Sequence, residues 1–223
     1  PYIASIVSGL SQRNGLTGLL QTYLGYQAGE LVRSGLFHRG DGTSIDAVIW
    51  FSDLRGFTDF ADNHTAEETL ACLNSAFDII GTSIYSLGGD ILKFIGDAVL
   101  AVFPIGDGMS AEAAAQAALK AAVDTQRAVK KWNAEHQESM NLGIALHRGA
   151  VHFGNVGSSS RLDFTITGAP VNEASRIESL CKVLGEGILI SDIVAELVDG
   201  QKFRNLGAHT LRGVKNPRTL YSL

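Results

Sequence analysis

The order of predicted elements in this 223-residue chain indicates an α+β domain with a ferredoxin-like βαββαβ core. Short β-branched and aromatic runs alternate with longer segments whose apolar residues recur every three or four positions. The composition, 45% hydrophobic and 18% charged, is that of an ordinary folded domain and excludes a disordered chain. We therefore expect a mixed or antiparallel sheet with helices packed on one face and an additional β-rich segment at the C-terminal end.

The first part of the chain is expected to be a helical lead-in followed by a linker. Leucines and tyrosines recur at roughly helical spacing over residues 15–32, and residues 38–44 are polar and rich in glycine. We therefore divide the chain into a lead-in and linker over 1–44 and a globular domain over 45–223. The lead-in is a candidate contact for a partner chain or an upstream module.

The first core elements follow in the order strand, helix, strand, strand. Residues 46–51 (DAVIWF) form a β-branched and aromatic run that is typical of a buried strand. Thr65, with a glutamate three positions later, forms a capping box that predicts the start of a helix with one continuous apolar stripe. Residues 90–103 predict two strands around a tight turn at Gly96 and Asp97.

The second half of the core continues this alternation. The alanine-rich segment over residues 111–132 predicts a helix, because alanine has the highest helix propensity. We expect strands over 142–147 and 151–156, joined by a turn at Arg148 and Gly149. The remaining predicted elements are a strand over 161–167, a helix over 170–184, a strand over 187–190, a short helix over 192–198 and a small β-rich tail.

Charge, cysteine content and hydropathy exclude several classes of protein. The net charge of −5 argues against a protein that wraps a nucleic-acid backbone, which needs a clustered basic surface. Cys72 and Cys181 lie in predicted helices among apolar neighbours, so we interpret them as buried, reduced thiols. No stretch reaches the apolar length of a membrane span. We expect a cytoplasmic catalytic or binding domain, and a start at proline leaves room for an upstream sensor or membrane module outside this fragment.

Two aspartates stand at the ends of predicted strands. Asp53 follows the first core strand and Asp97 lies in the turn of the next hairpin, so their carboxylates can face each other. Such a pair suits Mg²⁺ or Mn²⁺, which takes few protein ligands and leaves positions open for phosphate oxygens. The alternative is that each aspartate satisfies backbone donors in its own turn. Gly56, Phe57 and Thr58 should open a short helix whose free N–H groups cradle a phosphate.

Three segments carry a resemblance to a known family. They are FSDLRGFTDF, then GGDILKFIGDAVLAVF, then GIALHRGAVHFGNVGSSSRLDFTITGAPVNEASRIE, and they occur in this order between residues 46 and 223. Together they resemble the class III adenylate and guanylate cyclases. The resemblance implies that residues 45–223 form a nucleotide cyclase catalytic domain that uses two divalent metal ions per active site.

Matching the family pattern position by position implies a role for each of eight residues. Asp53 and Asp97 match the metal-binding aspartates, with the carbonyl of Leu54 as a third ligand. Lys93 matches the lysine that reads the adenine ring, and Thr165 falls at the second base-reading position. Asn172 and Arg176 match the pair that positions the ribose and stabilises the reacting phosphate, and Arg212 falls near the basic residue that holds the terminal phosphates.

The base-reading residues favour ATP over GTP. Lys93 can only donate hydrogen bonds, so it pairs with the adenine N1 acceptor and opposes the guanine N1–H. The commonest adenylate cyclase pattern has an aspartate where this chain has Thr165, whose hydroxyl both donates and accepts. Some members of the subgroup with threonine at this position respond to bicarbonate, so bicarbonate sensitivity is a further hypothesis.

The resemblance implies a cyclase that converts ATP to cyclic AMP and pyrophosphate. Asn172 and Arg176 are four residues apart on a predicted helix and share one face; the alternative is a solvated face with a contact between Glu173 and Arg176. Because the family shares each site between two domains, the full residue set in one chain implies a head-to-tail homodimer. A guanylate or mixed-specificity cyclase, a catalytically silent nucleotide-binding regulatory domain and a linear-product nucleotidyltransferase remain as alternatives.

Overall fold

The computed structural model describes residues 15–106, 108–136 and 139–223. Within these residues one mixed sheet has the strand order β2-β3-β1-β4-β6-β8-β7, and β5 pairs with β4 off this path. The strands are β1 (Gly42–Leu54), β2 (Asp90–Ile95), β3 (Ala98–Ile105), β4 (Leu142–Gly157), β5 (Leu162–Thr167), β6 (Ile188–Ser191), β7 (Arg204–His209) and β8 (Arg218–Ser222). The helices are α2 (Tyr26–Arg33), α3 (Phe57–Asn63), α4 (Ala66–Tyr85), α5 (Ala111–Glu135), α6 (Ala169–Leu184) and α7 (Asp192–Ala195).

The strand order confirms the predicted core. β1 is central and pairs antiparallel with both β3 and β4, while β2 forms a hairpin with β3 at the sheet edge. With α4 after β1 and α5 after β3, this is the βαββαβ arrangement. The predicted C-terminal β-rich segment extends the sheet: β6 pairs parallel with β4, β8 pairs antiparallel with β6, and β7 pairs with β8.

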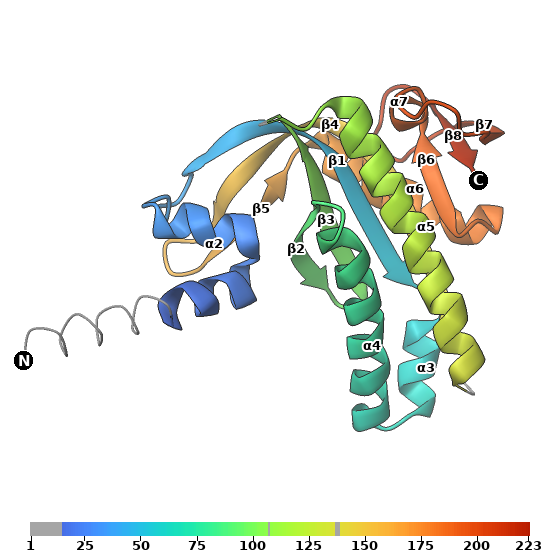
Figure 1. Ribbon diagram of the computed structural model, residues 1–223, viewed down its shortest axis with the longest axis horizontal. Coiled ribbons are helices and arrows are strands. Elements are labelled where there is room, and N and C mark those ends of the chain that lie inside the picture. The colour runs from blue at the N-terminus through green and yellow to red at the C-terminus, as the bar shows by residue number, and fades with distance from the viewer. Residues whose placement is uncertain (1–14, 107, 137–138) are drawn as a thin grey trace, which may run out of the picture.

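Helices cover both faces of the sheet, so the expectation of a single covered face is wrong in part. Alternate residues of β1 face opposite ways: Val48 and Trp50 pack with α4 and α5, whereas Ala47 and Ile49 pack in a second cluster with Ala174 of α6. Figure 1 shows α4 and α5 lying side by side across one side of the sheet and α6 behind it. The connecting helices α4 and α5 pack on one face of the sheet, as predicted, whereas α6 packs on the opposite face.

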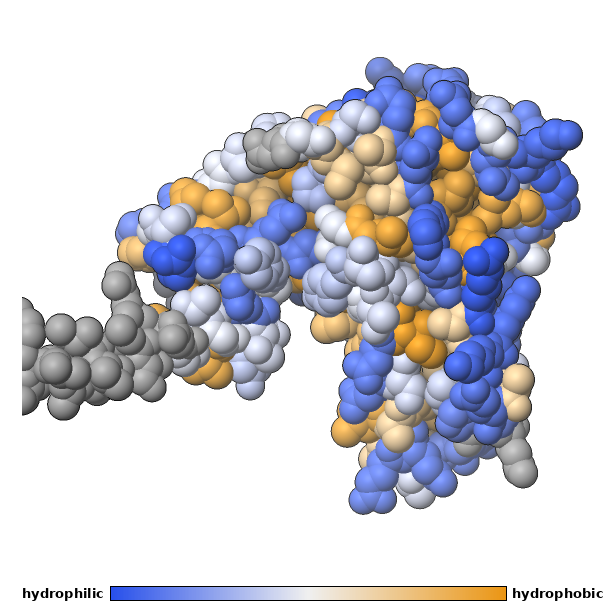
Figure 2. Space-filling model, in the orientation of Figure 1, coloured by the Kyte–Doolittle hydropathy of each residue, from blue (hydrophilic) through white to orange (hydrophobic). Residues whose placement is uncertain are grey.

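The two long helices form where their caps and apolar positions predict them. Thr65 accepts from the backbone N–H of Glu68, and the Glu68 carboxylate accepts from the N–H of Thr65, so the capping box is present. On α5 the buried positions are mainly alanines, which let the helix approach the sheet closely. Figure 2 shows hydrophilic side chains along the outer side of α5, so its apolar face is turned toward the sheet.

Strand β4 corrects one prediction: residues 142–157 form a continuous strand instead of two strands joined at a turn. β1 begins at Gly42, earlier than expected, and pairs with β4 along its whole length, from Gly42 opposite Gly154 to Leu54 opposite Leu142. Arg148, expected in the turn, bonds across the strands to Asp46, with Nη2 2.6 Å from Oδ2. The long partner strand satisfies backbone groups that a turn would leave unpaired.

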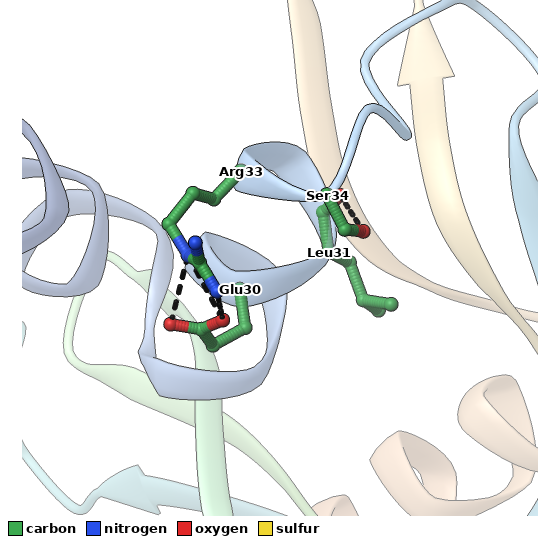
Figure 3. A network of polar contacts seen from close by, with 4 residues as sticks. All are labelled: Glu30, Leu31, Arg33 and Ser34. Carbon is green, nitrogen blue, oxygen red and sulfur yellow. Dashed lines mark hydrogen bonds and ion pairs between the residues drawn. The ribbon is translucent and has the colours of Figure 1, made fainter.

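The described part of the lead-in, residues 15–44, contains two helices, because Gly25 interrupts the helical segment. Residues 15–24 are helical, and Gly25 takes a φ of 87° before α2 begins. Asp90 at the start of β2 accepts from the backbone N–H of Gln27 at 3.1 Å, replacing a local cap. Figure 3 shows the other end of α2, where Arg33 donates to Glu30. Within the described residues, no helix is both long and apolar enough to span a membrane.

Candidate active site

The structure brings the carboxyl groups of Asp53 and Asp97 together where strand β1 ends and the turn between β2 and β3 lies. Asp53 is the second-last residue of β1, and Asp97 lies in the turn between β2 and β3. Because β3 pairs with β1, with Ser52 opposite Val99, that turn reaches the end of β1. Burial, a hydrogen bond with Asp97 and the like charge of Asp97 together raise the pKa of Asp53 to about 7.

This pair fits a divalent cation of the magnesium type. Two ionised carboxylates in contact repel each other, and a cation between them would relieve that repulsion. Within residues 15–106, 108–136 and 139–223, no three histidine, cysteine or acidic side chains gather into a metal-binding group. A site with two carboxylates needs further ligands from backbone carbonyls, water or substrate, which is the usual arrangement for Mg²⁺ with phosphates.

A third acidic side chain, Glu178, lies beside the pair, and the sequence analysis missed it. Burial and the negative charges of Asp53 and Asp97 together raise its pKa to about 7, against the opposing effect of Arg55. Its carboxylate lies against Gly143, the cross-strand partner of Asp53. The available signal was helical spacing, because Glu178 is four residues from buried positions such as Ala174 and shares their face.

The segment after Asp53 forms the predicted short helix. Gly56 takes a left-handed φ of 73° and α3 begins at Phe57, with no side chain capping its first turn. Arg55 is fixed by its backbone N–H, which donates to the carbonyl of Asn141 at 2.9 Å, and by its guanidinium, which donates to the carbonyl of Glu186. The loop that carries Asp53 and Leu54 is therefore held on both sides, whereas phosphate binding by Gly56, Phe57 and Thr58 stays a prediction.

Helix α6 presents Asn172 and Arg176 on one outward face, as their spacing predicts. Asn172 is exposed and Arg176 is half-buried, while the helix packs its other side on the sheet. Gly168 precedes the helix and Gly185 ends it with a left-handed φ of 73°. A cavity of about 610 Å³ opens beside this face, and two of its lining residues are cationic. The residues that line this cavity are Arg176, Ser179, Leu180, Thr210, Leu211 and Arg212.

The predicted alternative for Arg176, a contact with Glu173, does not form. Glu173 is buried and accepts from Arg218 Nε on β8 at 2.8 Å. Its other partner is His147, whose Nε2 lies 3.4 Å from Glu173 Oε2 and whose Nδ1 lies 2.9 Å from Ser191 Oγ. Burial lowers the pKa of His147 to about 4, so the imidazole is neutral, and its hydrogen bonds make it a structural residue.

Lys93 on β2 meets a residue that sequence analysis did not single out. Its ammonium nitrogen lies 2.5 Å from Oδ2 of Asp163 on β5, and this ion pair holds the pKa of Asp163 below its usual value. Thr165 is two residues further along β5 and therefore faces the same side as Asp163. Alternation along this strand could have grouped Asp163 with Thr165, but nothing in the sequence joins either residue to Lys93.

The residues expected in one site thus fall into three groups within a single chain. The carboxylates form one, the α6 face with Arg212 forms another, and Lys93 with the β5 residues forms the third. In the described part of the chain, no hydrogen bond or ion pair joins Asp53 or Asp97 to Lys93, Asn172 or Arg176.

Comparison with known proteins identifies the protein family to which this chain belongs. The family described as the adenylate and guanylate cyclase catalytic domain matches residues 43–223. The chain belongs to this family. The resemblance inferred from three short motifs is therefore confirmed, and so is the α+β fold.

Two of the relatives of this cyclase domain are adenylate cyclases. An adenylate cyclase of Anabaena cylindrica is 38% identical over 163 residues, which cover 70% of this chain and 31% of that protein. Adenylate cyclase 1 of Rhizobium meliloti is 29% identical over 232 residues, covering 99% and 35%. The chain thus spans about a third of the length of these two relatives.

Solved structures of similar fold are also nucleotide cyclases. A bacterial light-regulated adenylyl cyclase matches with a TM-score of 0.81 and 26% identity, over 100% of this chain and 65% of that one. The adenylyl cyclase CyaB from P. aeruginosa matches with a TM-score of 0.72 and 28% identity, over 81% and 94%. The guanylyl cyclase Cya2 matches with a TM-score of 0.70 and 31% identity, over 81% and 92%.

Proposed function

We propose that this cyclase domain is an adenylate cyclase that converts ATP to 3′,5′-cyclic AMP and pyrophosphate. The observation that carries the proposal is the contact between the carboxyl groups of Asp53 and Asp97 beside the start of α3. A domain that only dimerises has no use for two repelling carboxylates at a strand end, whereas a reaction on a metal-bound nucleotide does. Membership of the cyclase family supports the type of reaction, and the geometry of the site supports the choice of residues that we propose for it.

The metal-binding residues in this proposal are Asp53, Asp97 and the carbonyl of Leu54. Mg²⁺ or Mn²⁺ held there would lower the pKa of the attacking ribose 3′-hydroxyl and neutralise phosphate oxygens. The chain's own contribution is to hold the two carboxylates in a fixed place and to offset the negative charge around them. Arg55 serves this role because its guanidinium offsets the nearby charge of Glu178.

The α6 face and Arg212 handle ribose and phosphates. Asn172 is exposed and can orient the ribose by hydrogen bonds. Arg176 can donate two hydrogen bonds to phosphate oxygens as charge develops on them during in-line attack at the α-phosphorus. Arg212 lines the same cavity and can bind the terminal phosphates that leave as pyrophosphate. Two guanidinium groups in one cavity suit a polyphosphate anion.

Each active site is shared between two copies of the chain in this proposal. Arg176 lines the cavity beside α6, whereas Glu178, two residues later, faces the chain's own carboxylates. Residues two apart on a helix do not face the same way, so Arg176 points away from Asp53 and Asp97 of its own chain. A second copy placed head to tail brings its Arg176 to these carboxylates and generates two equivalent sites.

The base preference rests on Lys93. Its ammonium group offers hydrogen-bond donors and no acceptor, which matches adenine N1 and opposes guanine N1–H. A guanylate or mixed-specificity cyclase is the second candidate, because the guanylyl cyclase Cya2 is among the similar solved structures and Thr165 does not discriminate between the bases.

The test is to measure cyclic-nucleotide production from ATP and from GTP with Mn²⁺ or Mg²⁺ at high protein concentration. We expect cyclic AMP from the parent protein and none from Asp97→Ala. Equal production of cyclic GMP would replace the adenylate cyclase assignment with a mixed-specificity one. No product from either nucleotide, with dimers demonstrated in the same sample, would instead support a silent regulatory domain.

A further inference from the structure

Lys93 and Asp163 form an ion pair that the pairing pattern of the sheet does not require. Their strands are not hydrogen-bonded to each other: β2 pairs with β3, and β5 pairs with β4. The curvature of the sheet nevertheless brings Nζ of Lys93 to 2.5 Å from Oδ2 of Asp163. Both side chains are partly open to solvent, at 40% and 45% exposure. The pair is thus accessible to a ligand.

The surroundings of this pair are those of a binding site for a flat, partly apolar group. A cavity of about 260 Å³ adjoins it, and its walls come from β2, β5, the lead-in and Tyr85 at the end of α4. Leu92 and Phe94 of β2 and Phe164 of β5 also line this cavity. Thr165, the expected second base reader, lies on the same face of β5 as Asp163.

We propose that Asp163 is a positioning residue that determines base specificity by holding the ammonium group of Lys93. This inference rests on the proposed function and deepens it. A lysine side chain is a flexible four-carbon stem, and its three N–H donors point wherever the ammonium is held. Asp163 accepts one of them, so two donors remain at a fixed place for the acceptor on the edge of the base.

Fixing Lys93 matters because adenine and guanine present their acceptors at different positions. Adenine has its acceptor at N1, whereas guanine has a donor at N1 and its nearest acceptor at O6. A fixed ammonium serves N1 of adenine and confronts N1–H of guanine. A freed ammonium can swing toward O6 and accept guanine as well. Thr165 cannot supply this discrimination, because its hydroxyl both donates and accepts.

The experiment is to compare kcat and KM for ATP and for GTP in the parent protein, Asp163→Ala and Asp163→Asn. We expect Asp163→Ala to lower the ATP-to-GTP ratio of kcat/KM about tenfold, mainly through KM, which is the range of one charge-assisted hydrogen bond. Asp163→Asn keeps the shape and an acceptor oxygen without the charge, so its ratio should lie between the other two. It also serves as the second variant if Asp163→Ala does not fold.

A matched control comes from another ion pair between lysine and aspartate. Asp124 on α5 pairs with Lys120 on the surface, far in sequence from the base-reading residues. Asp124→Ala should leave the ATP-to-GTP ratio unchanged. In Asp163→Ala, the added substitution Thr165→Asp returns a carboxylate to the same face of β5, and we expect it to restore preference for ATP.

Two results would overturn the inference. One is an unchanged ratio in both Asp163 variants, which would make the ion pair a surface contact. The other is an equal loss of activity toward both nucleotides, which would make Asp163 a purely structural residue. The affinities of the parent protein and the Asp163 variants for ATP and for GTP, measured by calorimetry, test this inference without turnover. A parent protein that makes no cyclic nucleotide would refute the proposed function, and these affinities would still test the role of Asp163.

Discussion

An oxygen of the Glu178 carboxylate lies so close to the place of a β-carbon on residue 143 that any side chain at Gly143 of β4 would have to displace it. Gly143 is also the cross-strand partner of Asp53. The close packing of α6 on β4 therefore brings a third carboxyl group to the edge where Asp53 and Asp97 meet. The sheet, the helix and the candidate metal site depend on one another at Gly143.

Gly143→Ala should destabilise the protein by about 1–3 kcal/mol, because the added methyl group displaces a buried carboxylate from a packed interface. Urea unfolding monitored by circular dichroism measures this change. The matched control is Gly18→Ala, whose added methyl group meets nothing within 4 Å in a helical segment and should be neutral or stabilising. Equal stability of the two variants would contradict the packing that we describe.

Asp97→Asn should make the metal-free protein more stable at pH 8. The pKa of Asp53 is raised from 3.8 to about 7, so its ionisation destabilises the folded state, and this cost grows as the pH rises through that interval. Removing the charge of Asp97 relieves part of the cost. We expect a gain of roughly 1 kcal/mol, or about 2–4 °C in Tm.

The same variant should lose its response to metal. Mn²⁺ should raise the Tm of the parent protein, because a ligand that binds the folded state stabilises it, and should leave that of Asp97→Asn unchanged. Differential scanning fluorimetry with and without Mn²⁺ measures both effects. A metal-induced shift of equal size in the variant would show that the cation binds elsewhere.

His147 should impose a pH dependence on stability. Its folded-state pKa of about 4 lies below the ordinary value of 6.5, so the unfolded chain binds a proton more readily between these values. Its contribution is fully present above pH 6.5 and is lost as the pH falls toward 4. Relative to His147→Gln, which can still bond to Ser191, the parent protein should lose up to about 3 kcal/mol across this interval.

This comparison isolates His147, because the acidic groups near Asp53 titrate in the same interval in both proteins. The measurement is the free energy of unfolding of parent and variant in urea at several pH values. A constant difference between them from pH 7 to pH 4.5 would refute a neutral, buried imidazole.

Mixing two inactive variants should restore activity if the sites are shared. Arg176→Ala should lower kcat at least 100-fold, because it removes a hydrogen-bond donor to the charge that develops on the phosphate. This loss corresponds to an activation free energy higher by about 3 kcal/mol. Asp97→Asn should be inactive through loss of metal. In a heterodimer of the two, one site combines the intact carboxylates of one chain with the intact arginine of the other.

An equimolar mixture should therefore recover about a quarter of the parent activity, since half of the dimers are mixed and each holds one intact site. Cyclic AMP production after mixing and re-equilibration measures this recovery. The control is a mixture of Asp97→Asn with Asp53→Asn, which leaves every site without one carboxylate. Recovery in the control, or none in the first mixture, would exclude the head-to-tail arrangement.

The sequence by itself determined the elements that depend on short-range patterns. The capping box at Thr65 and the alanine run of α5 were placed correctly, because capping and helical periodicity are local properties. The spacing of Asn172 and Arg176 likewise fixed their common face on α6. Motifs of contiguous residues identified the family for the same reason.

The tertiary structure alone decided what depends on contacts between distant segments. The expected turn at Arg148 disappeared because β1 pairs along the whole of β4, and Glu178 reached the carboxylates because α6 packs over Gly143. Lys93 met Asp163 because the sheet curves between strands that are not paired. A residue's partner across the fold is set by the packing of the whole chain, and no local pattern in the sequence records it.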